Sequence, residues 1–208
     1  MTDFEEAVIL ALRTVFPSAK NAGCNYHFNQ CLWRKIQGLG LVKKYKENDE
    51  IKMHPRMCAA LAFLKLEDVD DGWLLIQEYS PEDPKLQEFY DYFVNQWMDN
   101  ALVTIEMWNC NNRRHRTNNA AEGWNNKLNH ALMTHHPTVR TLVATLKKEA
   151  EYSDFFICRK ELKLVGKRRR KNYIRIDERI EKCFIEYELT KDLRKFLRFA
   201  VAVLQKFE

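Results

Sequence analysis

Helical periodicity runs through almost all of this 208-residue chain, and few residues interrupt it. Glycine and proline, which break or end helices, occur only six and five times. The first helix shows an apolar stripe, which comprises Phe4, Val8, Ala11, Leu12 and Val15. Only two segments, Ala22–Asn25 and Ala101–Met107, are candidates for extended structure. In the second, apolar and polar residues alternate. The pattern therefore predicts a mainly α protein.

We expect a series of helices joined by short turns. The first begins at the capping box Thr2-x-x-Glu5 and ends before Pro17. A second helix is expected from about Tyr26 to Gly38 or Gly40. Further helices are expected over residues 55–66, 70–79, 84–99, 119–133, 138–162, 173–188 and 190–206. The last two carry continuous apolar stripes, so they should pack either onto the body of the protein or against another subunit.

Nothing in the sequence indicates export or a membrane. No stretch approaches the roughly 18 apolar residues of a membrane helix, and the first ten residues lack the basic start of a signal peptide. Six cysteines are spread along the chain, which without an export signal is typical of reduced thiols. We therefore expect an intracellular or nuclear protein that does not enter a membrane.

The charge is distributed unevenly between the two halves of the chain. Residues 1–100 hold 11 Lys and Arg against 16 Asp and Glu, whereas residues 101–208 hold 23 against 13. Basic runs stand at Arg113–Arg116 and at Lys167–Lys171. Such clusters favour a polyanionic partner for the second half. A solvated helix surface or an exposed loop between helices remains the alternative.

One carboxylate, Glu122, stands among asparagines in the segment RTNNAAEGWNNKLNHAL. A capping box explains it locally, with Asn119 as the cap of a helix and Glu122 at the third helical position. The helix would bury a stripe formed by Trp124, Leu128, Ala131 and Leu132. A different face would be wholly polar, comprising Glu122, Asn125, Asn126 and Asn129. A polar face is also typical of a cleft, so both explanations stay open.

Two features near the N-terminus have local explanations as well. Asp3 would lie just inside the first helix, where the helix dipole favours an acid. Cys24 and His27, followed by Cys31, are zinc-ligand types, but no second pair completes a site of three or four ligands. The spacing therefore favours a packed cysteine and a hydrogen-bonded histidine over zinc.

Two segments, in this order, resemble the Mutator-like element transposases. TDFEEAVILALRTVFPSAKNAGCNYHFNQCLWRKI resembles the region of their second catalytic aspartate, which ends a strand and is followed by a helix and a Cys-x-x-His pair. RTNNAAEGWNNKLN resembles the region of their third acid, where Arg-Thr-Asn precedes a glutamate and a tryptophan. The resemblance covers about residues 1–165. It implies catalytic, metal-binding roles for Asp3 and Glu122, and identifies Cys24 and His27 as the family motif.

This resemblance also implies a fold and a chemistry. The fold would be a partial ribonuclease H-like α/β core formed by residues 1–38 and 116–165, around a helical insertion over 39–115. A basic loop and a C-terminal helical pair over 166–208 would complete it. Two aspartates and the glutamate would bind Mg²⁺ or Mn²⁺ for phosphoryl transfer. In that interpretation DNA would be contacted by Arg113, Arg114, Arg116 and Asn118. The run outside the resemblance is a further candidate for DNA contact on its charge alone, and comprises Lys167, Arg168, Arg169, Arg170 and Lys171.

The sequence departs from the family at its start, because nothing before Met1 supplies the first aspartate or the central strands. We therefore expect a transposase-derived DNA-binding protein that does not cleave or join DNA by itself. The alternatives are a non-catalytic domesticated DNA-binding protein and a helical protein-interaction module that makes no nucleic-acid contact. Without those strands the first helix would expose apolar surface, which favours either aggregation or a homo-oligomer.

Overall fold

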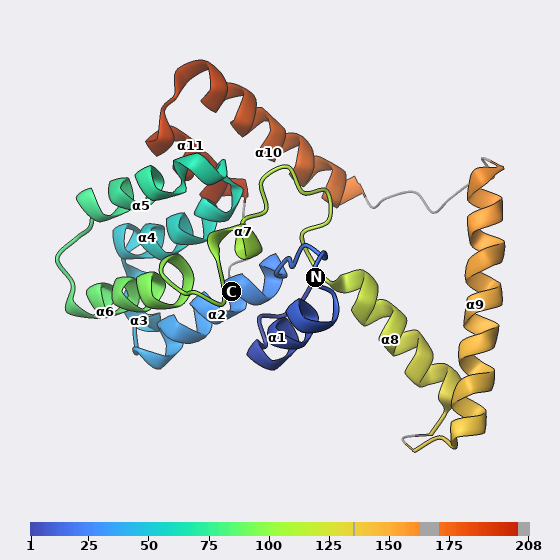
Figure 1. The fold of residues 1–208 in the computed structure, drawn as a ribbon. Coiled ribbons are helices and arrows are strands. Elements are labelled where there is room, and N and C mark those ends of the chain that lie inside the picture. Colours follow the sequence, from blue (N-terminus) through green and yellow to red (C-terminus); the bar gives the residue numbers. More distant parts are fainter. Residues whose placement is uncertain (135, 163–170, 204–208) are drawn as a thin grey trace. The chain divides into compact units, whose positions relative to one another are not determined.

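The computed structural model describes residues 1–134, 136–162 and 171–203, and these form helices almost throughout (Figure 1). The chain divides into two compact units, a larger one of Met1–Asn118 with Arg175–Glu208 and a smaller one of Asn119–Ile174. Helices of the larger unit are α1 (Glu6–Val15), α2 (Asn25–Gly38), α3 (Val42–Glu47), α4 (Asp49–Ala60), α5 (Val69–Glu78), α6 (Pro84–Phe93), α7 (Ile105–Trp108), most of α10 (Lys171–Thr190) and α11 (Leu193–Val203). Those of the smaller unit are α8 (Asn119–Leu132) and α9 (Val139–Glu161).

The larger unit is organised around a cluster of aromatic side chains contributed by separate helices. The rings of Phe28 and Trp108 are stacked, with centroids 5.2 Å apart and an interplanar angle of 3°. Trp97 packs edge-on against Phe28 at 4.8 Å, and its carbonyl accepts a hydrogen bond of 2.7 Å from the indole Nε1 of Trp108. Burial of such large rings stabilises this unit, and the Trp108 indole N–H is satisfied within the cluster.

Local sequence signals explain where several helices begin. The Asn48 side chain caps α4 by accepting hydrogen bonds from the backbone N–H of Glu50 and Ile51, at 2.9 and 3.2 Å. Asp83 caps α6 in the same way, and Pro84 occupies the first turn of that helix, where it needs no N–H acceptor. In the smaller unit, the Thr138 hydroxyl accepts from the backbone N–H of Thr141 and caps α9.

The expected ribonuclease H-like α/β core is wrong, because no strand occurs among the described residues. Their one extended pairing is an isolated parallel bridge between Thr2 and Gly23. A sheet needs several neighbouring strands, and the other extended candidate does not supply one. In the segment 101–107, the side chain of Asn100 instead accepts from the backbone N–H of Leu102 and Val103, and α7 follows. The mainly α prediction is confirmed.

The predicted start of the first helix is also wrong. Thr2 takes part in the isolated bridge, and α1 begins only at Glu6. Between them, Phe4 adopts a left-handed backbone conformation with φ of 70°. Its ring lies directly over Gly23, where an added Cβ would meet a ring carbon at 2.0 Å. Gly23 is therefore required by this close approach.

The C-terminal helices α10 and α11 pack on the body of the larger unit (Figure 1). Phe196 is buried and packs against Phe184 and Tyr187, with ring centroids 5.2 and 5.4 Å apart. Arg56 of α4 donates a hydrogen bond of 3.1 Å to the carbonyl of Val201. Of the two arrangements expected for this pair, the structure therefore shows packing on the body.

The smaller unit is a helical hairpin in which the described residues form no core. The predicted buried stripe of α8 is wrong, since Trp124 is 44% exposed and no residue of α8 or α9 is buried. The two helices contact each other through an ion pair of 2.6 Å between Lys127 and Glu149. The Lys127 ammonium also lies 4.3 Å from the ring centroid of Tyr152. No described helix of either unit is long and apolar enough to span a membrane.

Candidate nucleic-acid interface

The two acids expected to share a metal belong to different units. Asp3 is exposed in the larger unit, directly after the bridge residue Thr2. Glu122 is exposed in the first turn of α8, in the smaller unit. Neither unit by itself therefore contains both acids.

Asn118 and Glu122 lie at the start of α8, close to where the sequence places them. The helix begins at Asn119, so Asn118 comes just before it. The Oδ1 atom of Asn118 is buried and has no hydrogen-bond partner among the described residues. Asn125 and Asn126 are exposed together with Glu122, so the predicted polar face of α8 exists and faces solvent.

The Cys-x-x-His pair lies at the start of α2 in the larger unit. Cys24 is fully buried and its backbone N–H donates to the Thr2 carbonyl at 2.8 Å, whereas His27 is half-buried. Burial raises the pKa of the nearby Cys31 thiol, and this favours the protonated form over a metal-binding thiolate. Among the residues that the structure describes, no group of three or more His, Cys, Asp or Glu is placed to hold a metal ion.

The basic loop at 113–116 is largely engaged by the larger unit itself. Arg116 forms an ion pair of 2.7 Å with Asp177 of α10, and its guanidinium lies 5.8 Å from the ring centroid of Phe63. Arg113 donates hydrogen bonds to the carbonyls of Met107 and Glu106, at 3.2 and 2.5 Å. Arg116 and Arg113 thus have a structural role that the sequence did not suggest. Arg114 is exposed.

A groove of about 700 Å³ runs between this loop and α10. One side carries Arg113, Arg114 and Arg116, and the α10 side carries Asp177, Glu181 and Glu188. Cys110 lines it as well, and burial raises the pKa of this thiol to about 11. Because acids face the arginines, the groove does not present the uniformly positive surface that a phosphate backbone requires.

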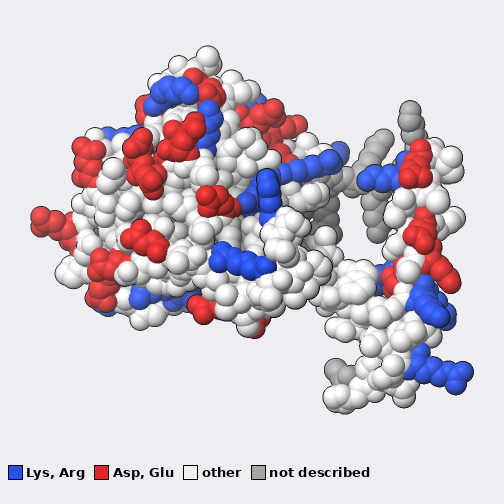
Figure 2. All heavy atoms as spheres, in the orientation of Figure 1, with Lys and Arg blue, Asp and Glu red and all other residues white. Residues whose placement is uncertain are grey.

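The net charge divides sharply between the two units. Residues 119–174, the smaller unit, hold 12 Lys and Arg against five Asp and Glu, which gives +7. The rest of the chain holds 22 against 24, which gives −2. On the face drawn in Figure 2, acidic side chains are spread over the larger unit. The concentration of positive charge on the smaller unit therefore identifies it as the candidate interface with a polyanion.

Most of this charge is concentrated in residues 159–171, which we call the basic segment. It holds eight Lys and Arg and a single acid, Glu161. Arg159 and Lys160 are exposed at the end of α9, and Lys171 is exposed at the start of α10. The predicted DNA contacts Lys167, Arg168, Arg169 and Arg170 lie outside the described residues. Arg159 and Lys160 were not among the predicted contacts, although a count of charge along α9 would have found them.

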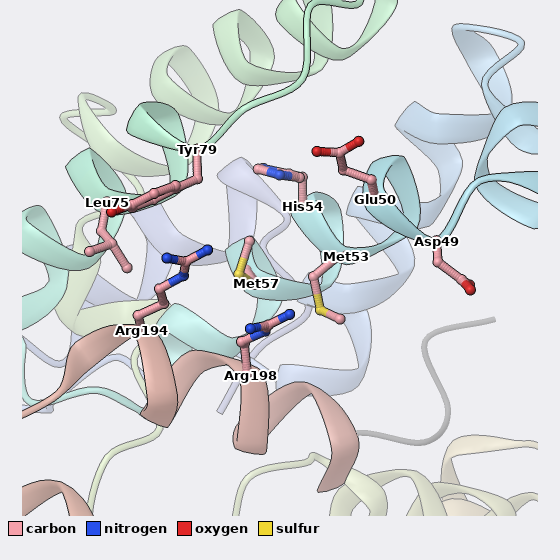
Figure 3. A pocket seen from close by; sticks show the side chains of 9 residues that line it. All are labelled: Asp49, Glu50, Met53, His54, Met57, Leu75, Tyr79, Arg194 and Arg198. Atoms are coloured by element: carbon pink, nitrogen blue, oxygen red, sulfur yellow. The ribbon is translucent and has the colours of Figure 1, made fainter.

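A second hollow, of about 340 Å³, lies between α4, α5 and α11 in the larger unit (Figure 3). Arg194 and Arg198 reach toward it from α11, whereas Asp49 and Glu50 come from the start of α4. His54 on its wall accepts or donates a hydrogen bond of 2.7 Å with the Tyr90 hydroxyl through Nδ1. Burial lowers the pKa of His54, so its neutral form is favoured. The buried imidazole is therefore packed as part of the core.

Comparisons with protein-family models, with curated proteins and with solved structures find no match to this chain. The resemblance to Mutator-like element transposases therefore depends on its two sequence segments alone, and it stays a hypothesis.

Proposed function

We propose that this chain is a DNA-binding protein derived from a Mutator-like element transposase, and that its smaller unit contacts the phosphate backbone. The observation that carries the proposal is the net charge of +7 on residues 119–174 against −2 on the rest of the chain. Lys and Arg side chains that neutralise phosphates release condensed counterions, and this release drives binding of any sequence. A unit that carries most of the positive charge is suited to this role.

The described cations of the basic segment suit this role. Arg159, Lys160 and Lys171 are exposed, and among the described residues none of them has a carboxylate within ion-pair distance. Arg116, in contrast, is already paired with Asp177. A guanidinium or ammonium that keeps its charge in solvent can exchange a counterion for a phosphate. The exposed cations of the basic segment therefore support backbone binding without sequence readout.

The polar face of α8 extends this interface in the proposal. Glu122 is accompanied there by Asn125, Asn126 and Asn129, all exposed. Amide side chains donate to phosphate oxygens and contribute to positioning on a duplex. In the transposase hypothesis Glu122 would help to hold Mg²⁺ or Mn²⁺ beside that phosphate. Backbone binding by the basic segment needs no metal, so the two roles are separable.

Salt-dependent binding of a fluorescent DNA duplex by the full chain tests the proposal. The logarithm of the association constant should fall linearly with the logarithm of salt concentration, with a slope near −0.9 for each neutralised phosphate. Addition of EDTA should leave the affinity unchanged, because the contacts come from Lys and Arg. A chain that shows no binding even at about 50 mM salt would instead be a helical protein-interaction module.

A further inference from the structure

One face of α9 carries an apolar seam with heptad spacing. The seam positions alternate at intervals of four and three residues and comprise Val139, Val143, Leu146, Ala150, Ser153 and Ile157, all of them apolar except the small Ser153. Its four larger apolar residues are 78%, 45%, 39% and 55% exposed, in the order Val139, Val143, Leu146 and Ile157. Apolar residues in this spacing form the contact line of a two-stranded coiled coil.

The seam does not hold the hairpin together. The contact of α9 with α8 uses Glu149 and Tyr152, through Lys127. The half-buried residues of α9 are Leu142, Thr145 and Glu149, which lie on that same side of the helix. The seam lies about a quarter turn around α9 from that side, at about 100° per residue, and all of its residues are exposed. It is therefore an unpartnered face of the smaller unit.

The charges that flank the seam show which partner it fits. Arg140, Lys147, Asp154 and Glu161 follow one another at intervals of seven residues, so they line one edge of the seam with two positive charges followed by two negative charges. Among the described residues, none of the four has an ion-pair partner. When two such helices run in opposite directions, the positive half of one edge lies beside the negative half of the other.

We propose that α9 pairs with α9 of a second copy of this chain, in antiparallel orientation about a twofold axis. When Leu146 of one copy lies opposite Ile157 of the other, Ala150 lies opposite Ser153. In this register Lys147 faces Asp154 of the second copy, and Arg140 faces its Glu161. Because the interface is twofold symmetric, each of these ion pairs occurs twice. Small residues at the centre allow the helices to approach closely.

A parallel pair lacks this complementarity. There the flanking edge of one helix faces the opposite edge of the other, which brings Asp154 near Glu149 of the second copy, two like charges. The length is sufficient, since the 23 residues of α9 span about 34 Å at 1.5 Å per residue. The apolar seam, the order of the charges and the length of α9 therefore all favour the same partner, α9 of a second copy in antiparallel orientation.

Sedimentation equilibrium of the full chain, without DNA, tests the pairing. Lys147→Glu places two acids opposite each other at both symmetry-related sites, and should weaken dimerisation by about tenfold. Asp154→Lys should have the same effect for the opposite reason. The double variant K147E/D154K exchanges the charges, and should restore the dimer to within about threefold of the parent. High salt should weaken the parent dimer, because it screens the ion pairs, but should not abolish it, because salt does not screen the contacts between apolar seam residues.

The neighbouring lysine provides the matched control. Lys148→Glu makes the same change of charge at an exposed position directed away from the seam, and should leave the dissociation constant within about threefold of the parent. Circular dichroism of each variant checks that the helices are retained. A chain that stays monomeric up to about 100 µM, an equal effect of K148E, or a double variant that does not recover would each overturn the proposal.

Discussion

The two units of this chain obtain their order from different sources. The larger unit buries an aromatic cluster that includes Phe28, Trp97 and Trp108, and its net charge is close to zero. The smaller unit buries none of its described residues and carries +7. A hairpin without a core gains little from hydrophobic burial, so its surface is available for contacts with other molecules. The larger unit is thus stabilised by its core, whereas the smaller unit leaves its described side chains open to solvent.

The largest expected difference between the units concerns their tryptophans. Trp108→Ala should lower the free energy of unfolding by about 3–5 kcal/mol, because the change empties a fully buried site and removes the hydrogen bond to Trp97. Trp124→Ala, at a half-exposed position of α8, should cost less than about 1 kcal/mol. Urea unfolding measures both values. Equal costs would show that the smaller unit has a core after all.

Removal of positive charge should lower the affinity for DNA in the smaller unit but not in the larger unit. Replacement of Lys167, Arg168, Arg169 and Arg170 by Gln should weaken binding at least about tenfold and reduce the magnitude of the salt slope by roughly 2–4. The matched control replaces the exposed larger-unit residues Lys20, Arg34, Lys43 and Lys46, an equal change of charge. Fluorescence anisotropy at several salt concentrations reads both. A comparable loss in the control would move the interface to the larger unit.

Helix caps should contribute unequally in the two units. Asn48→Ala removes the acceptor for two backbone N–H groups at the start of α4, and should cost about 1 kcal/mol of global stability. Thr138→Ala at the start of α9 should change global stability by less than about 0.5 kcal/mol, since α9 is not part of the core. Thermal unfolding compares the two variants. A larger effect of Thr138→Ala would indicate that α9 unfolds together with the larger unit.

The smallest effect expected is a dependence of stability on pH that arises in the larger unit. Burial lowers the pKa of His54, against the opposing effects of Glu50 and of a hydrogen bond to the backbone of Tyr79. Below its ordinary pKa of about 6.5 the unfolded chain binds a proton that the folded chain does not. The free energy of unfolding should therefore decrease as the pH is lowered from about 7 to about 5.

The variant His54→Gln should be less stable than the parent but should flatten this dependence. His130→Gln, which changes an exposed histidine of α8, serves as the control and should leave the dependence in place. Denaturant unfolding at several pH values measures the slopes. An unchanged slope in His54→Gln would assign the pH dependence to another group.

Much of the helical structure followed from local signals. Residues Asn25–Gly38 and Val139–Glu161 form helices close to the expected ranges, because apolar periodicity and the flanking breakers or caps are contained in the segment itself. The prediction failed between the second helix and residue 66, where α3 was not expected and α4 begins at Asp49 rather than near 55. The Asn48 cap was present in the sequence, and α4 continues through Pro55, a residue that usually interrupts a helix interior.

The candidate interface was predictable in part. The excess of Lys and Arg in the second half is a property of composition, and the structure concentrates it on one unit. The engagement of Arg113 and Arg116 was not predictable, because their partners, such as Asp177, lie far along the chain. A basic run in a sequence does not reveal which of its side chains are already paired.

The sequence by itself determined that this protein is helical, where most helices end and where the positive charge lies, because periodicity, caps and charge are local properties of the chain. Only the tertiary structure decided that the extended residues near Thr2 and Gly23 form a single bridge instead of a sheet. It also decided that α10 and α11 pack on the body while α8 and α9 bury nothing among the described residues. Pairing of strands and burial of a helix face depend on contacts between distant segments, and a local pattern does not specify its partner.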